Sequence, residues 1–137
     1  MEGYDIWYEG SLATRCVHRE NKDVIWTDAP KDNHGRGEKF SPTDLLAISL
    51  GSCILTIMGI QAERLKVDLS GTKASVTKEM AKTPPRRIAK ITILVTCPRS
   101  FSSELTAQLE KAALHCPVHH SLHPEVVQDI TFQWGSS

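Results

Sequence analysis

The sequence predicts an α+β fold in which antiparallel sheets wrap around one long, buried central helix. Two observations lead to this prediction. Residues 45–62 carry no formal charge and are mostly apolar, which is typical of a helix inside a protein. Segments before and after this stretch alternate between polar and apolar residues, which is typical of strands. The 137 residues are enough for one domain of ordinary size, so we expect a single domain over residues 1–137.

The central helix, expected over residues 40–60, has clear start signals. Ser41 can cap it, Pro42 suits the first helical position, and Asp44 lies where a capping-box carboxylate reaches back to the cap. About nineteen residues could span a membrane, but several small polar residues dilute this segment and no second span follows. We therefore expect a buried helix in a soluble protein with no membrane partner.

The other elements follow from hydrophobic periodicity and from turn and cap residues. Ser102 and Ser103 are expected to cap a second helix, which Pro117 ends. The expected elements are strands at residues 4–9, 11–19 and 24–27, the central helix, a strand pair or one bent strand at 67–80, a strand at 88–96, the second helix, and a strand at 126–134.

The central helix also predicts an oligomer. A helix that is apolar all round has more surface than about six strands and one other helix can cover. We therefore expect an intertwined homodimer in which the two central helices lie against each other and against both sheets.

Composition excludes several classes of function. Lys plus Arg equals Asp plus Glu, at 16 each, so nothing indicates binding to nucleic acid or to an anionic membrane. Glu2 and Asp5 follow Met1 without an apolar segment, so we expect no secretory signal and a cytoplasmic protein. The four cysteines, at 16, 53, 97 and 116, fit no zinc-ribbon or CxxC spacing, which leaves thiol chemistry or simple burial.

Cys53 and Cys116 are the cysteines most suited to chemistry. Cys116 directly precedes Pro117 and can cap a short helix, whose amide dipoles would lower the pKa of its thiol. Cys53 lies three turns into its helix, so a cation from elsewhere, an arginine, would have to activate it. Two such thiols with a guanidinium and an orienting carboxylate would make a peroxide-reducing site. Cys16 and Cys97 are expected to serve packing, and a small buried apolar role remains open for Cys53 as well.

Two motifs resemble a known family. Phe40-Ser-Pro-Thr-Asp-Leu-Leu-Ala-x-x-x-Gly-Ser-Cys53 and Leu114-His-Cys-Pro-Val-His119 are similar to the osmotically inducible protein C and organic hydroperoxide resistance family. The resemblance implies an intertwined α+β dimer that reduces organic hydroperoxides with its thiols. It matches Cys53 to the peroxidatic cysteine and Cys116 to the resolving cysteine. No cofactor or metal is then needed, and a dithiol reductant would regenerate the protein.

The polar partners of the first thiol depart from the family pattern. The family places an arginine and an acidic residue beside that thiol, with the acid directly after a proline. Here that position is Thr43, and the carboxylate is Asp44, which either replaces the family's acid or only caps the helix. Arg36, in the polar loop before the helix, is the first choice for the arginine, and Arg15 is the second.

Two other functions stay open from the sequence. A metal site could use the Cys/His cluster of residues 116–123, because zinc takes sulfur and imidazole ligands. A non-catalytic module could instead bind an apolar ligand beside Cys53. The residues concerned are Cys116, His119, His120 and His123 for the metal, and Leu46, Leu50, Ile57 and Ile60 for the apolar lining.

Overall fold

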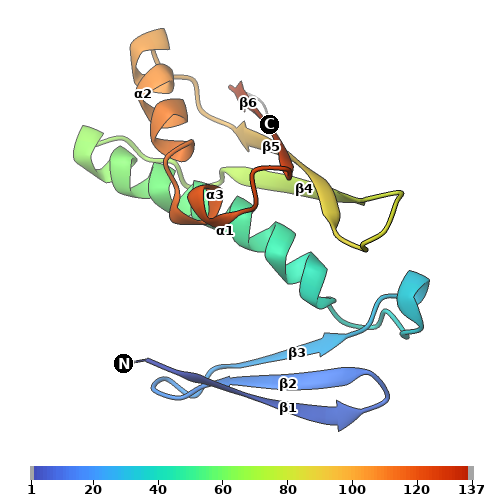
Figure 1. Ribbon diagram of the computed structural model, residues 1–137. Helices are drawn as coiled ribbons and strands as arrows, with labels where there is room; N and C mark the ends of the chain where they lie inside the picture. The colour runs from blue at the N-terminus through green and yellow to red at the C-terminus, as the bar shows by residue number, and fades with distance from the viewer. Residues whose placement is uncertain (1, 136–137) are drawn as a thin grey trace. The chain divides into compact units, whose positions relative to one another are not determined.

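The computed structural model describes residues 2–135. These form two compact units, and the boundary between the units lies between Leu46 and Ala47. The long helix α1 (Pro42–Leu65) begins in the first unit and supplies the first element of the second. Figure 1 shows a three-stranded sheet in the first unit and a second sheet with helices in the second unit, so the expected α+β class is confirmed.

The first unit is a three-stranded antiparallel sheet. Its strands β1 (Tyr4–Gly10), β2 (Ala13–His18) and β3 (Val24–Asp28) are hydrogen-bonded in that order. The three strands predicted from the alternating pattern are therefore confirmed, with ends that differ by one or two residues. A single 3₁₀ turn, η1 (Lys31–Asn33), lies within the polar loop that leads to α1.

The capping box predicted at the start of α1 is present. Ser41 Oγ accepts a hydrogen bond from the Asp44 backbone N–H at 3.0 Å. In return, Asp44 Oδ2 accepts from the Ser41 backbone N–H at 2.9 Å. These two reciprocal bonds satisfy donors that a helix start would otherwise leave unpaired.

The second unit has a mixed sheet rather than an antiparallel one. Strand β5 (Ile88–Cys97) is central, with β4 (Lys73–Met80) antiparallel on one side and β6 (Val127–Trp134) parallel on the other. The chain reaches β6 through α2 (Ser103–Ala113) and α3 (Pro117–Ser121). Parallel neighbours need such a crossover, so the antiparallel expectation holds for β4 with β5 and not for β6.

The core of the second unit lies between the helices and one face of this sheet. Alternate residues of β5 are fully or almost fully buried, as the pattern of that strand predicted. They pack with buried residues of α1 and α2 in one cluster, whose largest members are Leu50, Ile54, Met58, Ile91, Ile93, Val95 and Leu109.

The strand expected over residues 67–72 is wrong, because this segment is a turn. Lys66 has a positive φ of 59°, Asp68 Oδ1 accepts from the Ser70 backbone N–H at 2.8 Å, and Thr72 N–H donates to Leu69 O at 3.0 Å. The aspartate bonds the backbone two residues ahead, which is a turn that competes with strand pairing.

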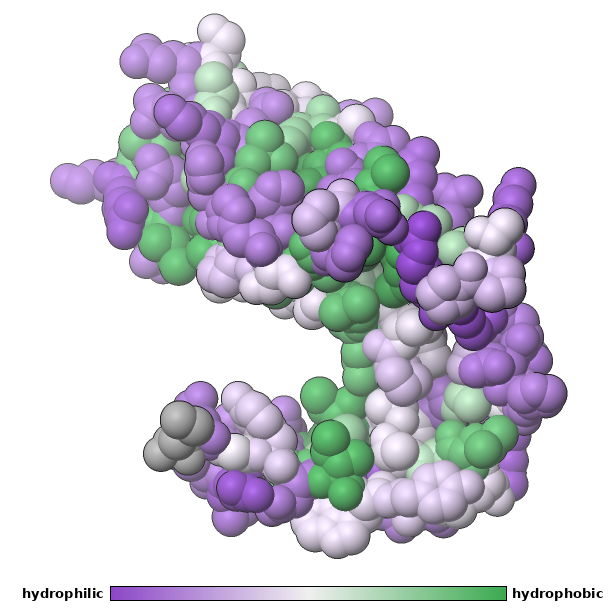
Figure 2. All heavy atoms as spheres, viewed as in Figure 1, coloured by the Kyte–Doolittle hydropathy of each residue, from purple (hydrophilic) through white to green (hydrophobic). Residues whose placement is uncertain are grey.

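One face of helix α1 packs into the core of the second unit, and apolar residues on the rest of the helix are exposed. Ile48 is 38% exposed and Ile60 is 44% exposed, and other apolar residues are visible at the surface in Figure 2. By length and composition α1 could cross a membrane, and one third of its most apolar window is buried within the described chain. Core helices of soluble proteins have the same length and composition.

Candidate active site

Helix α1 carries Cys53 about three turns after its start at Pro42. The side chain is partly buried and packs against the main core cluster of the second unit. Its neighbour Gly51 faces β4, where the Val76 side chain lies so close that a Cβ on residue 51 would meet it at 2.8 Å. Cys53 is therefore held on a helix whose position against the sheet is fixed by close packing.

Cys116 is the N-cap of α3, as predicted. Its backbone is extended, with φ −76° and ψ 146°, and Pro117 occupies the first helical position. The Cys116 sulfur accepts a hydrogen bond from the His119 backbone N–H at 3.2 Å. The residue is fully buried.

The two thiols lie close together in the second unit. Cys53 packs against the buried cluster that contains Cys116, and its thiol is near enough to raise the pKa of the Cys116 thiol. Both cysteines are free thiols. This packing joins residues 63 positions apart in the sequence, and the crossover after β5 is what returns Cys116 to α1. Of the pair, Cys53 is the more exposed and Cys116 the more buried.

The expected direction of the Cys116 pKa is wrong. Burial raises the pKa of the Cys116 thiol above its ordinary value of 9.0, and the nearby Cys53 thiol raises it further. The His119 N–H at the start of α3 lowers the pKa, as predicted, but its effect is smaller than that of burial. The short helix therefore orients the sulfur without making it an unusually acidic thiol.

Asp44 has the capping role that the sequence left as one of two alternatives. One of its carboxylate oxygens accepts from the Ser41 backbone N–H in the capping box. Its second suggested role, beside the Cys53 thiol, stays a prediction, because Asp44 belongs to the first unit and Cys53 to the second.

The two candidate arginines both lie in the first unit. Arg36 is exposed in the loop between η1 and α1. Arg15, on β2, pairs with Glu9 at 2.7 Å and lies over the Trp7 ring, with 4.3 Å from its Cζ to the ring centroid. Its guanidinium is thus held by a carboxylate and an aromatic face, whereas the assignment of Arg36 to the Cys53 thiolate stays a prediction.

His119 and Gln128 extend the site beyond the two cysteines. The Gln128 side chain, from β6, bonds the ring of His119 through His119 Nδ1 and Gln128 Oε1. It also donates from Nε2 to the His119 backbone oxygen at 3.2 Å. Gln128 has no role predicted from the sequence, although it is a polar residue at an inward position of an alternating strand, where apolar residues are expected.

The histidines near Cys116 gather without forming a metal site. The His119 and His120 rings meet edge to face, with centroids 5.1 Å apart, and the His115 and His120 centroids lie 6.0 Å apart. Within residues 2–135, no group of three or more His, Cys, Asp or Glu side chains is arranged to hold a metal ion. The structure therefore gives no support to the Cys/His metal alternative.

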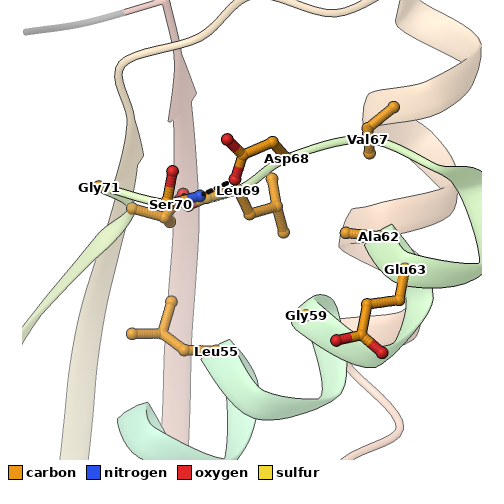
Figure 3. A pocket seen from close by; sticks show the side chains of 10 residues that line it. Leu55, Gly59, Ala62, Glu63, Val67, Asp68, Leu69, Ser70 and Gly71 are labelled. Atoms are coloured by element: carbon orange, nitrogen blue, oxygen red, sulfur yellow. Dashed lines mark hydrogen bonds between the residues drawn. The ribbon is translucent and has the colours of Figure 1, made fainter.

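Of the residues suggested as an apolar lining for Cys53, Leu50 is buried in the core and Ile57 packs against it. Leu46 and Ile60 are a little under half exposed. A separate pocket of about 380 Å³ lies further along α1 (Figure 3). It is enclosed by the end of the helix and the turn at residues 67–72, with Glu63 and Asp68 among its lining residues. A smaller pocket of about 270 Å³ lies between α1 and β4, beside Ser52.

Comparison with known proteins identifies the family. The sequence model of the OsmC-like proteins matches residues 35–131. The chain belongs to the OsmC-like protein family. Cys53 and Cys116 lie within the matched range, as do Arg36, Asp44 and Gln128, whereas Arg15 precedes it.

Solved structures of the OsmC-like fold agree with this membership. A protein of Psychrobacter arcticus, named for osmotic stress induction and a detoxification response, is 43% identical, with a TM-score of 0.92 and coverage of 97% of this chain and 96% of the other. An organic hydroperoxide resistance protein OsmC of Legionella pneumophila is 15% identical, with a TM-score of 0.77 and coverage of 97% and 96%. One from Elizabethkingia anophelis is 14% identical, with a TM-score of 0.77 and coverage of 98% and 96%.

The two more distant structures show the OsmC-like fold alone, and the Psychrobacter protein is similar in both sequence and fold. A search of curated proteins finds no match to the chain.

Proposed function

We propose that this OsmC-like protein is a thiol-dependent peroxidase that reduces organic hydroperoxides. The observation that carries the proposal is the packing of two free thiols into one cluster, with Cys53 partly exposed and Cys116 fully buried. Family membership supports it, since two of the solved structures with this fold are named organic hydroperoxide resistance proteins. A pair of neighbouring thiols on separate elements is what a two-cysteine peroxidase requires.

In the first step, the Cys53 thiolate attacks the distal oxygen of the hydroperoxide. The O–O bond breaks, Cys53 becomes a sulfenic acid, and the alkoxide leaves as an alcohol after it takes a proton. Cys53 suits this step because it is the more exposed of the two sulfurs. We assign Arg36 to stabilise its thiolate and Asp44 to position Arg36, with Arg15 as the second choice for the cation.

In the second step, Cys116 attacks the sulfenic sulfur. A Cys53–Cys116 disulfide forms and water leaves. Burial suits Cys116 to this role, because a buried thiol meets the neighbouring sulfur more readily than it meets substrate. An external dithiol then exchanges with the disulfide, returns both thiols and becomes oxidised itself, so no cofactor is needed. A cytoplasmic location, expected from the sequence, would keep the thiols reduced between turnovers.

Titration of free thiols before and after one equivalent of tert-butyl hydroperoxide tests the proposal. We expect two thiols to be lost, with a Cys53–Cys116 bridge found by peptide mapping. Cys53→Ser should abolish the reaction, and Cys116→Ser should stop at a sulfenic acid that dimedone traps on Cys53. Cys16→Ser is the matched control, because its cysteine lies on β2 in the other unit and should not change the result.

The same assay separates the two arginines. If Arg36 stabilises the thiolate, Arg36→Met should slow sulfenic acid formation more than Arg15→Met does, and the reverse result would assign the role to Arg15. Survival of all four thiols in the wild-type protein would refute the peroxidase proposal. Binding of an apolar ligand would then be the function to examine, and that binding should persist in Cys116→Ser.

A further inference from the structure

We propose that Gln128 is a positioning residue for Cys116, which it holds in place through His119. The proposal concerns the second step of the proposed peroxidase reaction and rests on that function for its kinetic consequence. Three contacts carry it. Gln128 makes two hydrogen bonds to His119, and the His119 backbone N–H donates to the Cys116 sulfur.

The location of Gln128 on β6 indicates a specific role. Val126, at the entry to the strand, and Ile130, Phe132 and Trp134 within it alternate toward the core and pack against its buried cluster. Gln128 has the same parity and is partly buried, so it is a polar residue in an otherwise apolar row. An amide removed from water costs free energy unless its polar atoms are hydrogen-bonded. His119 bonds both the oxygen and the nitrogen of the Gln128 amide.

The two bonds also determine which nitrogen of His119 carries a proton. The His119 backbone oxygen can only accept, so the amide nitrogen of Gln128 must face it. The amide oxygen then faces the ring, and because this oxygen can only accept, His119 Nδ1 must carry the hydrogen. In its neutral form, His119 is thus held as the Nδ1–H tautomer, with Nε2 unprotonated.

This arrangement links β6 to the sulfur through the backbone of α3. His119 is the third residue of a five-residue helix, which is too short to be stable by itself. Gln128 bonds both the ring and the carbonyl of His119, so it holds the residue whose N–H fixes the Cys116 sulfur. A sulfur held toward Cys53 needs less reorganisation to attack a sulfenic acid there.

Three variants test the proposal. Gln128→Met keeps the size of the side chain and removes both bonds. Gln128→Glu keeps an acceptor for His119 Nδ1–H and removes the donor to the His119 carbonyl. Gln133→Met is the matched control, because it makes the same change on β6 at an exposed position.

The first measurement is the tautomer of His119 in the reduced protein, read by nitrogen-15 NMR without any peroxide. We expect the Nδ1–H form in the wild type, in Gln128→Glu and in Gln133→Met, and a mixture of tautomers in Gln128→Met. The Nδ1–H form kept unchanged in Gln128→Met would overturn the proposal, whatever the activity of the protein.

The second measurement is the rate of each chemical step after one equivalent of tert-butyl hydroperoxide, by rapid quenching with an alkylating reagent and mass spectrometry. Sulfenic acid formation on Cys53 should be unchanged in Gln128→Met, whereas disulfide formation should slow about tenfold, as for the loss of one net hydrogen bond. The rate of disulfide formation in Gln128→Glu should lie between the rates of the wild type and of Gln128→Met.

An unchanged rate of disulfide formation in Gln128→Met would overturn the positioning role, even if His119 in that variant no longer keeps the Nδ1–H form. If the wild type forms no sulfenic acid, the peroxidase proposal fails, and the NMR measurement alone then decides whether Gln128 holds His119.

Discussion

At the scale of single residues, the site depends on the different surroundings of two cysteines. Cys116 is fully buried, caps α3 and accepts a hydrogen bond from a backbone N–H, whereas Cys53 lies on a long helix and is partly exposed. Burial disfavours the thiolate at Cys116 more than the N–H favours it, which raises its pKa. The Cys116 thiol is thus held in a fixed orientation and ionises only at higher pH.

This raised pKa predicts the pH dependence of the proposed second step, in which Cys116 attacks the sulfenic acid on Cys53. Cys116 must lose its proton to attack, and below its pKa the thiolate fraction grows about tenfold for each pH unit. Burial is the largest cause of the shift, and we expect it to persist when Cys53 is oxidised. The rate of disulfide formation, measured by rapid quenching, should therefore keep rising as the pH passes the ordinary thiol value of 9.0.

Cys16→Ser should give the same profile as the wild type. A rate that already levels off below pH 9.0 would instead mean that the His119 N–H outweighs burial.

The sequence predicted the residues of the site better than their electrostatics. The N-cap position of Cys116 follows from the proline after it, and Asp44 follows a known capping pattern. The closeness of Cys53 to Cys116 was implied only by family resemblance, because a separation of 63 residues carries no information on distance. The sign of the pKa shift depends on burial, which the local sequence around Cys116 does not contain.

At the scale of elements, the packing of α1 on β4 depends on one glycine of the helix. A Cβ on Gly51 would meet Val76 Cγ2 at 2.8 Å, whereas a Cβ on Gly59, two turns later, would meet nothing within 4 Å. Alanine substitution at these two positions therefore separates the effect of packing on stability from the effect of helix propensity.

Gly51→Ala should destabilise the protein by about 1–3 kcal/mol, because the added methyl overpacks the contact between α1 and β4. Gly59→Ala should stabilise it by about 0.5–1 kcal/mol, because alanine favours the helix and fits in open space. Chemical denaturation gives both free energies of unfolding. Equal effects of the two substitutions would show that the close approach at Gly51 does not limit packing.

The elements that the sequence did not predict owe their form to contacts across the chain or to local turn bonds. The turn at residues 67–72 has enough apolar residues for a strand, but Asp68 bonds the Ser70 N–H and directs the backbone away from pairing. The parallel pairing of β6 depends on where the α2–α3 crossover delivers the chain. Periodicity identifies the strand correctly and does not specify the direction of its neighbour.

At the scale of the whole molecule, each unit leaves apolar residues exposed. The first unit exposes Ile6 and Tyr8 on β1 and Ile25 on β3, which lie on one face of the sheet by their register. The second exposes Ile48 and Ile60 on α1. Several exposed apolar residues on one face are typical of a surface that binds another protein. The intertwined homodimer expected from the sequence remains the proposal that accounts for them.

The dimer predicts a molar mass of twice the 15.2 kDa of one chain, measured by light scattering after size exclusion. Ile60→Glu should shift the mass toward one chain, because a dimer that buries this position must also bury the new charge. Ala107→Glu adds the same charge at an exposed position of α2 and should leave the mass unchanged. A wild-type mass of one chain would contradict the dimer, and a dimer unaffected by Ile60→Glu would show that this face of α1 lies outside the interface.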